Sequence, residues 1–290
     1  MHRNAWFAGA EAALCANDPI QKIALTRALP NLLDTPAGAP AQVPSPVRRI
    51  PVPGRPERPA LVAPRQLQAR KLGSIPGRAA LVHAVAHIEF NAINLALDAI
   101  YRFRDLPDAY YIDWLSVALD EARHFEILTQ RLQTLGFQYG DFPAHNGLWQ
   151  AALDTDHDPL IRMALVPRVL EARGLDVTPG MIARLEEVGD AETVACLRVI
   201  LAEELNHVAI GTRWYRYLCA KTGIADSEGH FLDLLAQYSP GAIRPPFNEP
   251  ARKAAGFSAR EQAGLERLGM PSPPDRLTNH PPGFARSERE

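Results

Sequence analysis

Apolar residues recur at the three- and four-residue spacing of an α-helix through most of residues 74–223. No stretch of the chain alternates apolar and polar residues as a half-buried β-strand would. Pro167 should kink or split one of the helices. The chain is therefore predicted to be an all-α protein built on a four-helix bundle. The four main helices are predicted at about residues 75–103, 108–135, 159–173 and 191–221.

Two proline-rich stretches flank the predicted bundle. Residues 36–64 hold too many prolines for a regular helix and should form an extended arm, and the tail from Pro240 is again rich in proline. Shorter helical patterns occur at about residues 4–15, 19–29, 179–188 and 258–268. We expect three parts: a helical piece with the arm (1–73), the bundle (74–223) and a C-terminal tail that wraps the bundle (224–290).

The predicted second and fourth helices each carry a Glu-x-x-His pair, Glu121 with His124 and Glu204 with His207. Residues three apart project from one face of a helix, about one turn from each other. Apolar residues surround both pairs on those faces, so the four side chains should point into the bundle.

The predicted first and third helices each carry a glutamate in an apolar stripe, Glu89 and Glu171. Thirty-two residues separate Glu89 from Glu121, and 33 separate Glu171 from Glu204. The chain thus contains two copies of one helical hairpin. An approximate two-fold arrangement of the hairpins would bring all six glutamate and histidine side chains together.

Four buried carboxylates need partners, because an unpaired buried charge is very costly. Two divalent cations bound between the carboxylates remove that cost, so the pattern predicts a two-metal site. Oxygen-rich ligation with two imidazoles favours two iron ions, with manganese as the second choice, whereas zinc prefers fewer oxygens.

The segments HAVAHIEFNAINLALDAIYRF and DEARHFEILTQRLQTLGFQYGDFPAHNGLW resemble the DUF455 family of the ferritin-like superfamily. The resemblance extends over most of the chain, including the arm, and implies a ferritin-like di-metal fold without a settled substrate. A more distant likeness is to the tRNA hydroxylase that acts on a modified adenosine beside the anticodon. The superfamily pattern implies that Glu121 and Glu204 bridge the metals, that Glu89 and His124 complete one of them, and that Glu171 and His207 complete the other.

These resemblances imply a di-iron oxidoreductase that activates O2, most simply a hydroxylase or monooxygenase. It would need an electron donor and an organic substrate, either a small molecule or a nucleotide-like one, and it could form a homodimer. One alternative is iron oxidation or handling without an organic substrate. Another is a bundle whose metal is structural and whose task is protein interaction.

Several other side chains are candidates for supporting roles. Asp120 and Glu203 each precede a ligand glutamate, and they are either solvated charges or acceptors for the ligand histidines. His87 and His83 lie four residues apart, away from the face of Glu89, and are expected to orient ligands, pack or face solvent. Tyr215 is expected to pack in the core.

The arm is basic at Arg48, Arg49, Arg55 and Arg58, and again at Arg65, Arg70 and Lys71. These side chains either pin the arm to helix carboxylates or form an anion-binding strip for phosphate groups. The arm lacks aromatic residues for base stacking, which favours the first interpretation.

Composition limits the remaining choices. The formal net charge of −2 argues against a general nucleic-acid-binding surface. Cys15, Cys196 and Cys219 are too scattered for a disulfide framework, and the chain shows neither a signal-peptide pattern nor an apolar run long enough to span a bilayer. We expect a cytoplasmic protein that has no membrane partner.

Overall fold

The computed structural model describes residues 3–32, 46–67, 71–238 and 243–270. Its regular elements are all helices, and the described residues contain no β-strand, only one isolated bridge between Leu61 and Ala144. The predicted all-α class is confirmed. The predicted boundaries between arm, bundle and tail remain a prediction.

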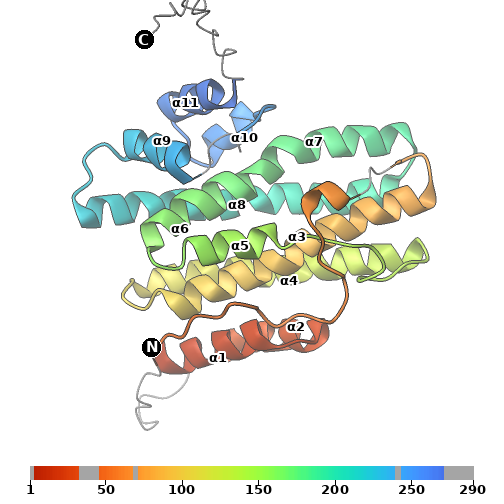
Figure 1. Cartoon of the computed structure of the whole chain (residues 1–290), viewed down its shortest axis with the longest axis horizontal. Coiled ribbons are helices and arrows are strands. Elements are labelled where there is room, and N and C mark those ends of the chain that lie inside the picture. The colour runs from red at the N-terminus through yellow and green to blue at the C-terminus, as the bar shows by residue number, and fades with distance from the viewer. Residues whose placement is uncertain (1–2, 33–45, 68–70, 239–242, 271–290) are drawn as a thin grey trace, which may run out of the picture.

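Four long helical segments form the bundle (Figure 1). Helix α3 packs along α4, α7 packs along α8, and α4 contacts α8. The segments are α3 (Ile75–Arg102), α4 (Asp108–Thr134), the continuous stretch α6 (Pro159–Leu165), η3 (Val166–Glu171) and α7 (Ala172–Glu187), and α8 (Ala191–Thr222).

Local signals in the sequence set the ends of these helices. Ser74 caps α3 by accepting a hydrogen bond from the Gly77 N–H, and Asp190 caps α8 by accepting one from Thr193. Helix α8 ends at Gly223, whose φ of +78° is a left-handed conformation that glycine adopts without strain. These caps explain why the predicted limits of the two helices agree closely with the observed ones.

The third bundle segment differs from the prediction. It was expected to end at Gly174, with a separate helix starting near Pro179, but the helix continues through both residues. Pro179 cannot donate a backbone hydrogen bond to the Leu175 carbonyl four residues earlier. The Asn248 side chain donates to that carbonyl instead, at 3.0 Å. The predicted disturbance at Pro167 takes the form of a π-helical turn, η3.

Additional helices cover two sides of the bundle (Figure 1). Helices α1 (Arg3–Cys15) and α2 (Pro19–Ala28), which agree with the predicted ranges, pack on α3 and α4. The tail forms α9 (Ser227–Tyr238) and α10 (Glu249–Ala254), which were not predicted, and α11 (Ala259–Gly269), which agrees with the predicted range 258–268. Helix α9 packs on α6, α10 contacts α7 and α8, and α11 packs on α9. Helix α5 (Gly147–Asp154), which was not predicted, packs on α3.

The described part of the arm, residues 46–67, runs as extended chain except for the short 3-10 helix η2 (Pro64–Gln66). It is held by backbone contacts, since the Gly54 N–H donates to the Leu14 carbonyl at 2.8 Å. A Cβ at Gly54 would lie 2.3 Å from the Cys15 carbonyl carbon, so only glycine allows this approach. The rest of the predicted arm, residues 36–45, lies outside the described residues.

Helix α3 is the one described helix long and apolar enough to cross a membrane. In this structure 83% of its most apolar window is buried inside the protein. Its apolar character therefore reflects its position at the centre of the bundle, where α1, α4 and α5 all contact it.

A buried lysine joins α2 to the end of α1. Lys22 Nζ donates to the Ala13 and Leu14 carbonyls at 2.9 and 2.8 Å, and the side chain is fully buried. Burial lowers the pKa of Lys22 to about 7. The ammonium thus completes the hydrogen bonding of the last turn of α1, but the protein must bury a charge to keep it protonated.

We expect Lys22 to make stability depend on pH. An unfolded lysine has a pKa near ~10.4, so between about pH 7 and 10 the unfolded chain binds more protons and stability rises with pH. Relative to Lys22→Met, the native protein should gain about 2 kcal/mol in free energy of unfolding between pH 6 and pH 9. Urea unfolding at both pH values measures the difference. An equal offset between the two proteins at both pH values would contradict the lowered pKa.

Candidate metal centre

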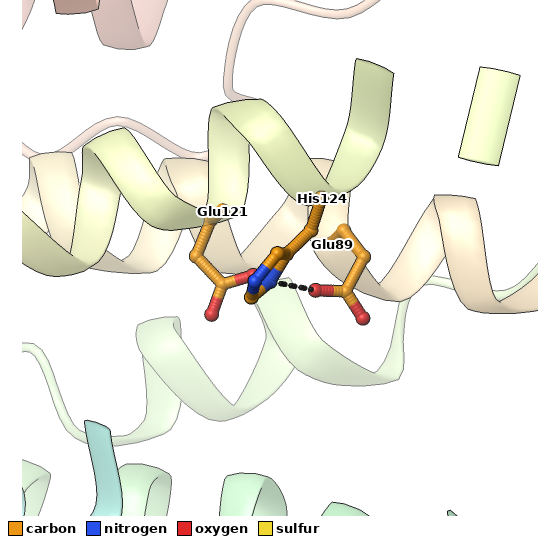
Figure 2. A group of neighbouring side chains, drawn as sticks. All are labelled: Glu89, Glu121 and His124. Atoms are coloured by element: carbon orange, nitrogen blue, oxygen red, sulfur yellow. Dashed lines mark hydrogen bonds and ion pairs between the residues drawn. The ribbon is translucent and has the colours of Figure 1, made fainter. Parts of the chain in front are cut away.

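Six acidic and imidazole side chains that the sequence placed on four helices are all buried inside the bundle. Two groups of three can each hold a metal ion, with their ligand atoms within 4.8 Å of one another. Figure 2 shows the first group, in which Glu89 from α3 meets two residues of α4. The groups are Glu89, Glu121 and His124, and Glu121, Glu204 and His207.

Glu121 belongs to both groups and lies between the two histidines. Its Oε2 is 3.4 Å from His124 Nδ1, and its Oε1 is 3.0 Å from His207 Nδ1. His124 Nδ1 is also 3.1 Å from Glu89 Oε2, and His207 Nδ1 is 3.4 Å from Glu204 Oε2. Each histidine therefore presents its Nδ1 to two carboxylates, and Glu121 offers one oxygen to each side, as a bridging ligand would.

Glu171 is buried beside this cluster but is in neither group of three. It is the last residue of the π-helical turn η3. Burial, followed by the charges of Glu204 and Glu121, raises the pKa of Glu171 well above its usual value, which places the three carboxylates in one electrostatic environment. Glu204, expected to bridge, belongs to the second group only.

Outside the cluster, each histidine is held by a carboxylate from the opposite helix. His124 Nε2 on α4 lies 2.6 Å from Glu203 on α8, and His207 Nε2 on α8 lies 3.2 Å from Asp120 on α4. In a neutral imidazole whose Nε2–H donates a hydrogen bond to such a carboxylate, the lone pair is on Nδ1 and is directed at the cluster. The structure thus places Asp120 and Glu203 where acceptors for ligand histidines belong.

Arg123 links the two outer carboxylates. Its Nη2 donates to Asp120 at 2.9 Å and to Glu203 at 2.5 Å. Arg123 lies inside the first Glu-x-x-His motif but was not among the predicted functional residues, because its partner Glu203 lies 80 residues away in sequence. It fixes the two acceptors relative to each other across the α4–α8 interface.

The electrostatics of the six central residues show a need for positive charge. Burial raises the pKa values of Glu89 and Glu204, while burial of Glu121 is outweighed by the adjacent His124 and His207 rings, which lower its pKa. Burial lowers the pKa of His124, but the adjacent Glu121 and Glu89 carboxylates outweigh burial and raise the value to about 11. Protonated imidazoles thus partly balance the clustered carboxylates.

Three buried atoms in the cluster have no hydrogen-bond partner among the described residues, namely Glu121 Oε2, Glu171 Oε2 and His207 Nδ1. Buried polar atoms are nearly always satisfied, so these atoms are well suited to coordinate an ion. Four carboxylates and two imidazoles suit iron or manganese better than zinc. The residues present therefore fit the predicted metal pair.

A cavity of about 150 Å³ adjoins the cluster. All four glutamates line it, and most of the remaining lining is apolar. Gly174 of α7 also lines it, and a Cβ there would contact Glu204 Cγ at 3.6 Å, so the glycine borders the cavity rather than ending the helix as predicted.

His87 is buried away from the cluster. Its Nδ1 lies 2.9 Å from the Tyr139 hydroxyl, and its Nε2 lies 3.2 Å from the His145 carbonyl oxygen. Burial lowers the pKa of His87 to about 4, so the ring is neutral near pH 7. It joins α3 to the segment that follows α4, and no contact links it to a ligand histidine. Tyr215 is fully buried and packs against Phe231, in agreement with the expected core position.

The described arginines of the arm lie away from the cavity lining. Arg48 pairs with Glu11 of α1 at 2.6 Å, and Arg49 pairs with Asp156 at 2.7 Å. Arg55 donates to the neighbouring Pro56 carbonyl, and Arg58 borders a separate groove between α2 and α4. Arg48 and Arg49 therefore hold the arm against helical segments. Arg70 lies outside the described residues.

Comparison with known proteins adds a family to this geometry. The family model described as "Protein of unknown function (DUF455)" matches residues 15–263. The chain belongs to the DUF455 family. An uncharacterized protein of Haemophilus influenzae (strain ATCC 51907 / DSM 11121 / KW20 / Rd) is 47% identical over 213 residues, which cover 71% of this chain and 74% of the relative. No solved structure matches the chain. The matched DUF455 region includes every residue of the candidate metal centre.

We expect Glu203→Gln to weaken metal binding without unfolding the bundle. The amide loses the negative charge that holds the His124 imidazole, and loss of such an outer partner typically costs about 10–100-fold in metal affinity. Glu192→Gln, at a residue of the same helix whose side chain is 73% exposed, is the matched control and should leave affinity unchanged. Anaerobic titration with ferrous iron measures both. Equal affinities in the two variants would refute the role given to Glu203.

Proposed function

We propose that the cluster holds two metal ions, iron in the first instance and manganese as the second choice, in a ferritin-like bundle. The observation that carries the proposal is the position of Glu121 between two histidines whose Nε2 atoms are each held by a carboxylate of the opposite helix. This arrangement repeats the same donor set on both sides of one shared carboxylate. It has no evident purpose in a bundle that binds no metal, because apolar residues would stabilise the core at lower cost.

We further propose that the protein is an oxidoreductase that uses O2 to hydroxylate an organic substrate. Two ferrous ions at such a site would supply electrons and open coordination positions for the reduction of O2. Hydroxylation of a C–H bond places one oxygen atom in the product and reduces the other to water, with two protons and two electrons from an external donor.

The protein's own residues would prepare the site for this chemistry. Glu89, Glu121 and His124 would hold one metal ion, and Glu121, Glu204 and His207 would hold the other. Glu171, buried beside them, would supply the remaining carboxylate. Asp120 and Glu203 would accept hydrogen bonds from the Nε2–H groups and so keep the imidazoles oriented. Glu171 is in neither preformed group and lines the cavity, so its carboxylate would face a molecule bound there.

The apolar cavity favours an organic substrate over iron oxidation alone. A metal cation that passes through apolar surroundings loses its hydration at high cost, and the walls of this cavity beyond the four glutamates are mainly aliphatic. Such walls also exclude water from the metals. Iron handling and a purely structural metal are the rival functions, and the two experiments that follow separate them.

We expect protein reconstituted anaerobically with ferrous iron to bind about two ions per chain. Glu204→Ala should lower that number, because it removes a ligand that is buried beside His207. Glu192→Ala, at an exposed position of the same helix, should bind as much iron as the native protein. Metal analysis after removal of free iron provides the measurement. Native protein that retains no more iron than a variant lacking all four glutamates would exclude the metal centre.

We expect the reduced, iron-loaded protein to consume O2 and to convert an organic compound in a cell extract. Mass spectrometry of reactions under ¹⁸O2 should detect a product heavier by one ¹⁸O atom. Consumption of O2 that yields only ferric iron with water or hydrogen peroxide, in the presence of every extract fraction, would replace hydroxylation by iron oxidation. Bound iron that never reacts with O2 would favour the structural role.

A further inference from the structure

The cavity beside the cluster of glutamates and histidines has a mainly apolar lining. Most of its lining residues come from α3, α7 and α8, with others from α4, α5 and η3, and its acidic groups are the four glutamates. Away from the glutamates most of its walls are aliphatic, with Thr178 as an uncharged polar residue and Arg173 as a cation. The aliphatic residues include Ala92, Leu95, Val177, Leu197, Ile200 and Leu201.

The cavity reaches the surface of the protein where its exposed lining residues lie. Ile88 lines it and is 48% exposed, and the partly buried Leu148 and Met181 line it as well. Arg173 is the one cation among the lining residues, but it already donates to the Arg244 and Pro246 carbonyls at 2.7 and 3.0 Å. Its guanidinium therefore holds the chain before α10 in place and is engaged at the mouth.

The π-helical turn and small residues create this space. Leu170 and Glu171, the last two residues of η3, line the cavity, and Gly174 follows one turn later without a side chain. Bulky aliphatic residues fill the rest of the core around it. A void that persists beside the only cluster of buried carboxylates with metal-binding geometry among the described residues is consistent with a binding chamber rather than a packing fault.

We infer that this chamber binds a neutral hydrocarbon group of a small organic substrate, with one C–H bond directed at the four glutamates. Cavities of ~150 Å³ with aliphatic and aromatic walls are known to bind benzene. The chamber therefore admits a group of up to about six carbon atoms, whereas polar parts of the substrate must remain at the mouth near Ile88 and Met181. The role of the bound group as part of a substrate rests on the proposed function, but binding in the chamber can be measured without turnover.

The test uses fluorobenzene as the probe and ¹⁹F NMR as the readout. We expect the full-length protein to bind it with a dissociation constant on the order of 1 mM, with or without metal. In protein loaded anaerobically with ferrous iron, the bound ¹⁹F signal should be broadened far beyond that in zinc-loaded protein, because the ligand lies next to a paramagnetic ion. A bound signal of equal width in both forms would place the ligand elsewhere and overturn the inference.

Variants of the chamber wall supply the controls. Val177→Phe should fill the chamber and weaken fluorobenzene binding by about 10-fold or more, since the added ring occupies the same space. Val199→Phe, at a valine on α8 that is 38% exposed and does not line the chamber, is the matched control and should bind normally. Met181→Ala should enlarge the chamber at the mouth and improve binding of the larger probe 1-fluoronaphthalene.

The outcomes separate this inference from the proposed function. If fluorobenzene binds beside iron but no extract compound is ever hydroxylated, the chamber is supported and the proposed activity is refuted. A protein that hydroxylates an extract compound but binds neither probe retains the activity and loses the chamber. Folded Val177→Phe that binds fluorobenzene as tightly as the native protein would overturn the inference, as would Met181→Ala with no gain for 1-fluoronaphthalene.

Discussion

The burial of four carboxylates in one apolar bundle is the constraint on which the rest of the centre depends. Burial is the leading cause that raises the pKa values of Glu89, Glu171 and Glu204, so the core resists three further negative charges. The protein offsets these charges with two imidazoles that face the carboxylates. A further carboxylate holds the other side of each imidazole. Removal of one of these side chains would leave an unpaired buried charge, so all four helical segments of the bundle must contribute to the cluster.

The C-terminal helices support the centre although they contribute no ligand. Arg168, in the π-helical turn that ends at Glu171, is fully buried and pairs with Glu261 of α11 at 2.6 Å. On the other side of the turn, Pro167 packs so closely on α8 that a Cβ at Gly211 would lie 2.3 Å from its ring. Aromatic residues from α8, α9 and the segment before α11 surround the Arg168 guanidinium, namely Tyr215, Phe231 and Phe257. The tail therefore fixes the backbone from which Glu171 projects.

Local signals made the main helices and the clustering of the glutamates and histidines predictable, whereas long-range contacts were not visible in the sequence. Apolar spacing and the caps at Ser74 and Asp190 define α3 and α8, and the Glu-x-x-His pairs follow from helical geometry alone. The helix that passes through Pro179 was missed because Asn248, a distant residue, satisfies the freed carbonyl. The crossed pairs of Asp120 and Glu203, and the cavity, likewise arise only when α4, α7 and α8 are assembled.

The hairpin of α3 and α4 and the hairpin of α6–η3–α7 and α8 are not equivalent. They differ at Glu89 and Glu171, two of the glutamates that line the cavity. Glu89 projects from a regular α-helix and belongs to a preformed group of three, whereas Glu171 ends a π-helical turn and belongs to none. A π turn holds more residues than an α turn, so it shifts Glu171 from the position that strict two-fold symmetry would give it. Its neighbours Leu170, in the same π turn, and Gly174, in the first turn of α7, line the cavity. The one π-helical turn of the bundle segments thus coincides with the carboxylate outside the preformed groups and with the wall of the cavity, a feature that two regular, symmetric hairpins would lack.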